Sequence, residues 1–340
     1  MGLITVESLS RTSVVYDPIL RKLPFFTLME ELKKIGANLK GADGEDILFQ
    51  FQRKNGSSRP YDANNIGKGT SVGTVIERKM ESERSYNAQQ DSILNYEGSK
   101  VMSNTAEPVD EKTKKHPLEY LMIESILRNT SDDILSAVFL GVRDATNQTP
   151  IGMVDGWFTK LAQDIVAGEV AAGKGNLITT GAIADPGTGT DAYDQVVEFL
   201  LAMNNMLRYN GGNLYMTDTT KFYAKKALRN LFAGNFLVKD SEFIEILKDQ
   251  TGISNLNIIT HPAMGSGSQL MFTKPGILDF GMDNSGGSKF VQIRQINEDP
   301  NIMDFWTQWK MGTRIASVHQ KEFACNEQTN TSPMNFGDIS

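Results

Sequence analysis

The chain reads DGEDILFQFQR at residues 43–53 and VGTVIERKM at residues 72–80. Apolar and polar side chains alternate in the first run, and the second continues in extended form past Arg84 to Ile93, Leu94 and Tyr96. A polar stretch containing NGSSRP and several glycines separates the two runs. Period-two alternation between glycine clusters predicts a long two-stranded β-ribbon, which we place at residues 41–99.

This ribbon is too polar to fold by itself. Only 17 of its 59 positions hold Ala, Val, Ile, Leu, Met, Phe or Tyr, whereas 40% of the whole chain is hydrophobic. An isolated hairpin is marginal in water even with a good apolar face. The ribbon is therefore either disordered or held by something outside itself, and such an arm ahead of the core is typical of proteins that build assemblies.

Length and composition limit the class of protein. A chain of 340 residues can form a large core, and we expect two lobes. No apolar run is long enough to span a membrane, and the start of the chain does not read as a signal peptide, so we expect an intracellular protein. The net charge of −7 and the lack of a basic block argue against strong nucleic-acid binding. Cys325 is the only cysteine, so no intrachain disulfide can form.

The rest of the chain predicts a mixture of helices and strands. Helical spacing of Leu28, Leu32 and Ile35 predicts a short helix that stops at Gly36. An amphipathic segment starts at His116-Pro117 and forms a long helical rod over 117–145, with Asp132 and Asp133 at the start of its second half. A second core begins near residue 191 with a helix over 191–208. The remaining expected strands are Asn213–Thr217, Leu256–Thr260, Leu270–Thr273, Ile277–Phe280, Lys289–Gln295 and Phe305–Ala316, followed by a frayed tail over 326–340.

No group of residues adds up to an active site. Gly168–Gly175 has the spacing of a phosphate-binding loop, but Gly175 stands where Ser or Thr must hold magnesium, and the preceding residues have helical spacing. His116, His261 and His319 have no second ligand at metal-binding spacing. The paired carboxylates lie at helix starts or in exposed loops: Glu30-Glu31, Glu45-Asp46 and Asp132-Asp133. We therefore expect no catalytic, cofactor-binding or metal site and no enzymatic activity.

The order of elements resembles that of a known family. An arm, a short helix, a polar β-ribbon, an amphipathic rod, a mixed α/β lobe and two closing strands are together similar to the major capsid protein of tailed bacteriophages, the Hong Kong 97-type fold. The phrases AVFLGVR at 137–143, DGWF at 155–158 and NLYMT at 213–217 resemble the end of the family's spine helix, the segment after it and a strand of its axial domain. They are similar to capsid proteins of phages that infect Bacteroides-like bacteria.

The resemblance implies an α+β protein with five parts. These are an N-terminal arm with a short helix at 1–40, an extended loop at 41–99, a peripheral domain at 100–190 and 289–325 with its spine helix at 117–145, an axial domain at 191–288, and a C-terminal tail at 326–340. Some members cross-link a loop lysine to an asparagine of a neighbour. Lys40, Lys54 and Lys68 have suitable positions, but we assign no cross-link.

The resemblance also implies the function and the partners. Copies of the chain would assemble as hexamers and pentamers into an icosahedral head around double-stranded DNA, touching the DNA weakly and without sequence preference. A portal and possible scaffolding or decoration proteins are further implied partners, with synthesis in the host cytoplasm, a final place in the virion and no membrane contact. The alternatives are an encapsulin-like nanocompartment shell, a nucleotide-binding enzyme that uses Gly168–Gly175, and a tail or baseplate protein.

Overall fold

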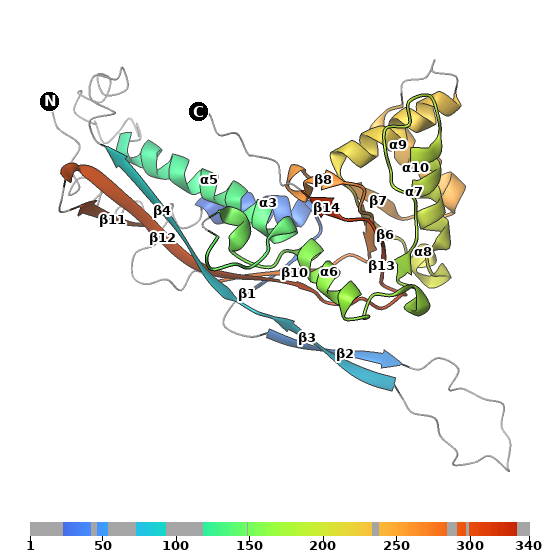
Figure 1. Cartoon of the computed structure of the whole chain (residues 1–340), viewed down its shortest axis with the longest axis horizontal. Helices are drawn as coiled ribbons and strands as arrows, with labels where there is room; N and C mark the ends of the chain where they lie inside the picture. Colours follow the sequence, from blue (N-terminus) through green and yellow to red (C-terminus); the bar gives the residue numbers. More distant parts are fainter. Residues whose placement is uncertain are drawn as a thin grey trace, which may run out of the picture.

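The computed structural model describes most of the chain (Figure 1). The described residues are 23–41, 46–53, 73–92, 118–147, 149–232, 238–283, 291–296 and 299–331. Several expectations lie outside them: the arm before residue 23, the tip of the ribbon at 54–72 with Lys54 and Lys68, the helix start at His116-Pro117, and the last nine residues. Within the described ranges, none of the helices has the length and apolar character needed to cross a bilayer.

One long strand organises the first sheet. β12 (Asp299–Ile315) pairs with β11 (Val291–Ile296) and with β4 (Glu83–Ser92) along its first part, and with β10 (Leu278–Asp283) along its last part. β1 (Asn38–Gly41), a strand that we did not expect, adds parallel to β10. Phe305, Thr307 and Trp309 are buried while the residues between them are partly exposed, which is the period-two pattern of a half-buried strand.

The ribbon is shorter than the sequence suggested. β2 (Asp46–Arg53) pairs with β3 (Gly73–Met80) in a separate two-stranded sheet that extends from the body of the molecule (Figure 1). β4, which we had placed in the same ribbon, instead pairs over its full length with β12. The expected loop at 41–99 therefore contains a ribbon that ends at Met80 and a separate strand, β4, which is paired along one edge of β12.

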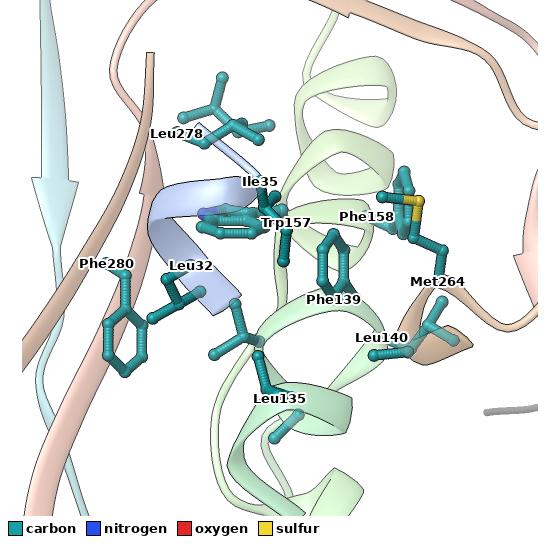
Figure 2. Close-up of a cluster of buried hydrophobic side chains, with 14 of the residues drawn as sticks. Leu32, Ile35, Leu135, Phe139, Leu140, Trp157, Phe158, Met264, Leu278 and Phe280 are labelled. Atoms are coloured by element: carbon teal, nitrogen blue, oxygen red, sulfur yellow. The ribbon is translucent and has the colours of Figure 1, made fainter. Parts of the chain in front are cut away.

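Three helices cover one face of this sheet and form the first core. They are α3 (Leu23–Lys34), α5 (Leu118–Leu140) and α6 (Trp157–Val166). Figure 2 shows their apolar side chains meeting those of β10, with Trp157 and Phe139 in edge-to-face contact at a centroid distance of 5.1 Å. Both rings are fully buried, so this aromatic pair fixes how α6 packs on α5.

The long helix ends earlier than expected. α5 stops at Leu140 rather than at 145, because Gly141 passes so close to the carbonyl of Val154 that no side chain fits there. The Gly141 carbonyl accepts hydrogen bonds from the Gly156 amide and the Thr159 hydroxyl, and the Val142 amide donates to Ile151. Residues 151–159 fold back against the end of α5 and form hydrogen bonds with backbone groups there. These contacts are tertiary, so the local sequence pattern does not predict them.

The second sheet joins the two cores. Its strand order is β5 (Leu177–Ile178), β13 (Phe323–Asn326), β9 (Met271–Thr273), β6 (Gly212–Tyr215) and β7 (Leu256–Ile259). Tyr215 and Met271 face the first core, whereas Leu214 and Phe272 face a second core. Helices α7 (Asp191–Ala202), α8 (Asn205–Asn210), α9 (Asp218–Leu231) and α10 (Asp240–Thr251) belong to this second lobe (Figure 1). A sheet buried on both faces explains the continuous apolar runs of its strands.

Short elements complete the fold and tie down the chain end. They are the 3-10 turns η3 (Pro150–Gly152), η4 (Ala172–Lys174) and η5 (Pro262–Met264) and the paired strands β8 (Ser266–Gly267) and β14 (Asn330–Thr331). The tail that we expected to fray from 326 is ordered through residue 331. Asn326 is fully buried and hydrogen bonds with Thr180, Ser268 and Leu270, so a polar sequence here reflects a buried amide network.

The sheets do not divide the chain at the expected residues 288 and 325. β10 lies inside the segment 191–288 but pairs with β12 in the first sheet, and β13 lies inside 289–325 but pairs with β5 and β9 in the second. The reason is that strand pairing joins segments that are far apart in sequence, whereas the boundaries were drawn from contiguous runs.

Paired glycines mark the place where the ribbon leaves the body. Gly281 of β10 and Gly312 of β12 are directly opposite each other, and Met80 is fully buried over them. A Cβ atom on Gly281 would collide with the Met80 methyl group, and one on Gly312 would lie 2.5 Å from the Glu81 carbonyl oxygen. The two glycines form a notch that lets the chain cross the sheet between β3 and β4.

We predict that Gly312→Ala destabilises the protein more than Gly281→Ala. The methyl group added at position 312 would clash with backbone atoms of Glu81, which should lower the free energy of unfolding by about 1–3 kcal/mol. The methyl group added at position 281 would meet only the end of the flexible Met80 side chain, which can move away. Urea unfolding of both variants tests this. Gly173→Ala, at a glycine with open space around it, is the matched control and should change stability by less than about 0.5 kcal/mol. An equal loss of stability in Gly281→Ala and Gly312→Ala would contradict this prediction.

Candidate functional site

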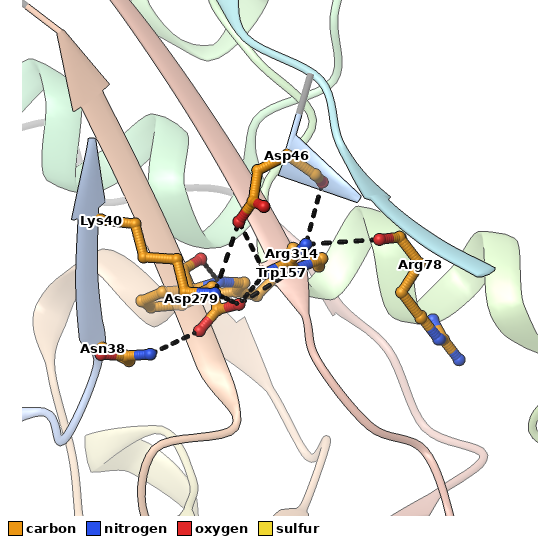
Figure 3. A network of polar contacts seen from close by, with 7 residues as sticks. All are labelled: Asn38, Lys40, Asp46, Arg78, Trp157, Asp279 and Arg314. Atoms are coloured by element: carbon orange, nitrogen blue, oxygen red, sulfur yellow. Dashed lines mark hydrogen bonds and ion pairs between the residues drawn. The ribbon is translucent and has the colours of Figure 1, made fainter. Parts of the chain in front are cut away.

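A buried arginine holds the base of the ribbon. Arg314 of β12 is 2% exposed, and all five of its N–H donors are used (Figure 3). Nε and Nη2 donate to Asp279 Oδ2 at 2.9 and 2.5 Å, and Nη2 also donates to Asp46 Oδ2 at 3.1 Å. Nη1 donates to the main-chain carbonyls of Asp46 at 2.9 Å and Arg78 at 3.3 Å. One side chain thus binds both strands of the ribbon where they leave the body.

Strand register creates this arrangement. Asp279 is opposite Arg314 in the β10–β12 pair and opposite Asn38 in the β1–β10 pair. The three side chains therefore form a row across the sheet, in which Asn38 donates to Asp279 Oδ1 at 3.0 Å. Lys40 Nζ lies 3.3 Å from Asp279 and 3.4 Å from Asp46. The Asp279 carbonyl accepts from the Trp157 indole at 3.0 Å, which connects the row to the first core.

The charges of this cluster depend on one another. Asp279 and Arg314 have side chains that are each 1% exposed, so neither ion is stabilised by bulk water. Pairing and complete hydrogen bonding compensate for the loss of solvation, and removing one partner leaves a buried charge without compensation. The cluster therefore makes the position of the ribbon base sensitive to a single residue.

The sequence did not single out Arg314, Asp279 or Asp46 as a group. Glu45-Asp46 was expected in an exposed loop or at a helix start, yet Asp46 begins β2 and binds Arg314; Glu45 is outside the described residues. One signal was available: Arg314 is the only charged residue of Met311–Ile315, a run that is entirely buried. A charge in a buried strand needs a partner, but the sequence does not say which carboxylate supplies it.

The glycine loop at 168–175 lacks the setting of a phosphate site. It follows helix α6, and Gly168 and Gly175 adopt φ values of +71° and +70° in tight turns. Lys174 pairs with Glu169 at 3.0 Å, so its ammonium group is engaged by a neighbour on the same loop. A phosphate-binding loop joins a strand to the start of a helix, and here the chain goes from a helix to the short strand β5.

The histidines and the cysteine have structural surroundings. His261 stacks on Phe139 at 5.8 Å, and its Nδ1 accepts from the Ala263 amide; burial lowers the pKa of this imidazole. His319 Nδ1 accepts from the Lys321 amide at 3.2 Å, and His116 is outside the described residues. Cys325 is fully buried in β13, and burial raises the pKa of its thiol, which disfavours the thiolate form that reacts. Across the described ranges, no three His, Cys, Asp or Glu side chains form a group able to hold a metal ion.

Asp132 and Asp133 do not cap a helix. They lie in the middle of the continuous helix α5, because Asn129, Thr130 and Ser131 are themselves helical. Burial and, as the smaller cause, the charge of Asp132 together raise the pKa of Asp133 to about 6. Glu30 and Glu31 lie in the second half of α3, where Glu31 pairs with Lys34 at 2.6 Å. Neither Glu30-Glu31 nor Asp132-Asp133 has the arrangement of an acid–base site.

Comparison with solved structures identifies the architecture. A chain of the satellite phage P4 procapsid, a structure that includes the size determination (Sid) protein, matches with a TM-score of 0.54 and 14% identity over 89% of this chain and 90% of that one. The capsid of the native GTA particle matches with a TM-score of 0.52 and 13% identity over 88% and 96% of the two chains. The capsid of Myoviridae phage XM1 matches with a TM-score of 0.52 and 9% identity over 88% and 91%.

The chain has the Hong Kong 97-type capsid fold. The α+β architecture expected from the order of elements is thereby confirmed. Identities of 9–14% show a shared fold and nothing finer. No protein-family model matches the chain, and no curated protein matches it in sequence. Within this fold, the Arg314 cluster lies where the two-stranded ribbon meets the body.

We predict that Arg314→Met lowers the free energy of unfolding by about 3–5 kcal/mol, because it leaves Asp279 buried without its main counter-charge. Arg314→Lys should recover only part of the loss, since a lysine cannot supply a planar fork to two carboxylates and two carbonyls. Lys310→Met on the same strand, at a partly exposed position, is the matched control. Chemical unfolding of the three variants measures their stability. If Arg314→Met lost no more stability than Lys310→Met, the proposed role of Arg314 in holding the ribbon base would be wrong.

We also predict that the contribution of Asp133 to stability falls as the pH rises from about 4 through 6, because Asp133 has a higher pKa in the folded protein than in the unfolded chain. Its stabilising contribution is complete below the unfolded pKa and is lost above the folded one. Asp133→Asn should therefore be more stable than wild type at pH 8 by about 1–2 kcal/mol after allowing for solvent screening, and equal to it at pH 4. Thermal melts at both pH values, with the exposed Glu245→Gln as control, measure the difference.

Proposed function

We propose that this chain is the major capsid protein of a tailed bacteriophage, and that copies of it assemble as hexamers and pentamers into an icosahedral head around double-stranded DNA. The observation that carries the proposal is the ribbon: a two-stranded extension from a body with the capsid fold, one side of which exposes the apolar residues Ile47, Phe49 and Val75. A structural role without enzymatic activity follows from the same proposal.

The register of the ribbon supports a partner on that face. Ile47 is opposite Lys79 and Phe49 is opposite Glu77, so both apolar residues lie on one side of the ribbon, together with Val75, two residues from Glu77. Phe49 is 67% exposed, Val75 is 59% exposed and Ile47 is 40% exposed. A two-stranded ribbon with one bare apolar face gains stability when a neighbouring surface covers it. In a closed shell, the neighbouring copy would supply that surface for every subunit.

The two lobes fit the parts of a capsid subunit. We propose that the lobe built on α7, α8, α9 and α10 is the axial domain near the centre of each capsomer, and that the first sheet with α5 is the peripheral domain. The N-terminal arm expected ahead of α3 would reach other subunits, since α3 and β1 themselves are packed in the first core and the first sheet. The net charge of −7 suits a shell that must enclose DNA without binding it tightly.

A shortened ribbon tests the proposal. We would join Phe49 directly to Glu77 through an Asn-Gly turn, which removes residues 50–76 but keeps Asp46, Arg78, Met80 and the register. We expect wild-type protein to form shells or capsomers in negative-stain microscopy and size-exclusion chromatography. The shortened protein should remain folded, with a similar melting transition, and should fail to form closed shells.

Two outcomes would contradict the proposal or replace it. Wild-type protein that stays monomeric at all concentrations and salt conditions would argue against a shell subunit. Small shells that enclose a protein guest, rather than large heads with DNA, would favour a nanocompartment of the encapsulin type. Purifying particles from the native host and measuring their diameter and content separates these cases.

A further inference from the structure

The first sheet has one face that helices cover and an opposite face, here called the outer face, that is partly exposed. Thr307 and Trp309 of β12 are buried on the covered face. Gln308 and Lys310 alternate with them and are partly exposed on the outer face. Arg84 of β4 is opposite Lys310 and is exposed, so it points to the same side. Two cations are therefore cross-strand neighbours on an accessible surface.

The row that contains these cations has an excess of positive charge. Within the described ranges, neither the Arg84 nor the Lys310 side chain takes part in a hydrogen bond or an ion pair. Glu83, the neighbour of Arg84 in sequence, pairs with Arg143 at 3.2 Å. Asp283 is opposite Lys310 in the β10–β12 pair, so the row across the sheet holds two cations and one carboxylate. Like charges directly opposite each other on a sheet repel, and a carboxylate placed above both cations would offset this repulsion.

The ribbon carries a carboxylate among exposed apolar residues. Glu77 of β3 is opposite Phe49 of β2, and Val75 lies on the same side of the ribbon. The Glu77 carboxylate is 3.8 Å from the Lys79 ammonium group, and both side chains are 47% exposed. A pair at this distance in solvent contributes little stability, so Glu77 remains available to other cations.

The spacing of residues on the outer face matches that on the ribbon. Tyr86, two residues beyond Arg84, is 55% exposed and begins the next row of the outer face. Residues two apart along a strand are separated by about 6.8 Å on both surfaces. A ribbon that places Glu77 above the Arg84–Lys310 row therefore places Val75 above the Tyr86 row, where apolar side chains cover the aromatic ring.

The ribbon of the same copy does not reach this surface. It leaves the body at the Gly281–Gly312 notch and extends away from the half of the sheet that contains β4, β11 and the start of β12 (Figure 1). Glu77 lies on the ribbon side of this notch, and Arg84 lies on the sheet side. A ribbon that covers the two cations therefore belongs to another copy.

We propose that Glu77 from the ribbon of a second copy binds between Arg84 and Lys310 on the outer face of the first sheet. This inference rests on the proposed shell function, in which the ribbon of each subunit lies against a neighbour. The contact names the surface that covers the exposed side of the ribbon. It also fixes the register, because a shift by two residues would bring Lys79 over the same cations.

Charge reversal tests the contact. Glu77→Lys and Arg84→Glu should each raise the protein concentration needed for assembly at least tenfold, because like charges then meet. The double variant restores opposite charges and should return this threshold to within about threefold of wild type. Glu30→Lys makes the same charge change on α3, which covers the other face of the sheet, and should leave the threshold unchanged. All four variants should melt within about 2 °C of wild type, since these side chains are exposed.

A disulfide between copies locates the contact. Protein with Glu77→Cys is mixed with protein with Arg84→Cys, so a bond between the introduced thiols can join only different copies. The native Cys325 is fully buried. Assembly of the mixture with oxidised glutathione should give a disulfide-linked dimer that contains one copy of each kind. Replacing the Arg84→Cys protein by Glu30→Cys protein should give none, and a lack of the mixed dimer in assembled particles would overturn the proposal.

The outcomes also distinguish this inference from the function on which it rests. If wild-type protein assembles and both single reversals assemble at the same threshold, the Glu77 contact is wrong and the shell function stands. If the single reversals raise the threshold but the double variant does not restore it, these charges act separately and the contact is again wrong. If wild-type protein does not self-associate, both the shell function and the contact fail.

Discussion

The hydrogen-bonded ion pair between Arg314 and Asp279 is the interaction on which the rest of this structure depends. It lies between two paired strands, is almost completely excluded from water, and extends to Asp46 and to the Arg78 carbonyl at the two edges of the ribbon. A buried ion pair adds little net stability compared with an apolar pair, but it is specific about geometry because its donors must all be satisfied. In this chain, that specificity fixes the point from which the ribbon departs.

The paired glycines complete the same joint by steric means. Gly281 and Gly312 leave room for Met80 and for the Glu81 backbone, so the chain can leave the ribbon and enter β4 over the surface of the sheet. The ion pairs and the glycines therefore act on the same point of the ribbon, because Asp46 is paired with Met80 and lies next to Arg78 and Glu81. Beyond this joint the ribbon has its own two-stranded pairing and an exposed apolar face. The base of the ribbon is held by contacts within the chain, whereas apolar residues farther along the ribbon stay exposed.

Much of the architecture followed from local patterns. The short helix that stops near Gly36, the buried strand ending in NLY, the start of α7 at Asp191 and the second half of β12 could all be predicted, because apolar spacing and capping residues act over a few positions. The helix expected over 191–208 is instead broken into α7 and α8 after Ala202. The errors have a common cause. The end of α5 at Gly141, the pairing of β4 with β12, the added strand β1 and the ordered tail at Asn326 are each decided by contacts with segments more than ten residues away. Period-two alternation predicts a strand but not its neighbour, which is why the whole of 41–99 was assigned to one ribbon.

The sequence by itself determined the elements, the low apolar content of the ribbon and the lack of any recognisable catalytic motif. These properties depend on residue type and on spacing along the chain. Only the tertiary structure decided which residues form the joint, because Asp46, Asp279 and Arg314 are separated by 233 and 35 positions and no periodicity connects them. It also decided that Nη1 of Arg78 binds Asp164, whereas Nε and Nη2 have no hydrogen-bond partner among the described residues, since these contacts arise only when β3 and α6 pack together. Charge pairing in a folded protein is set by distance in space, and the sequence records only distance along the chain.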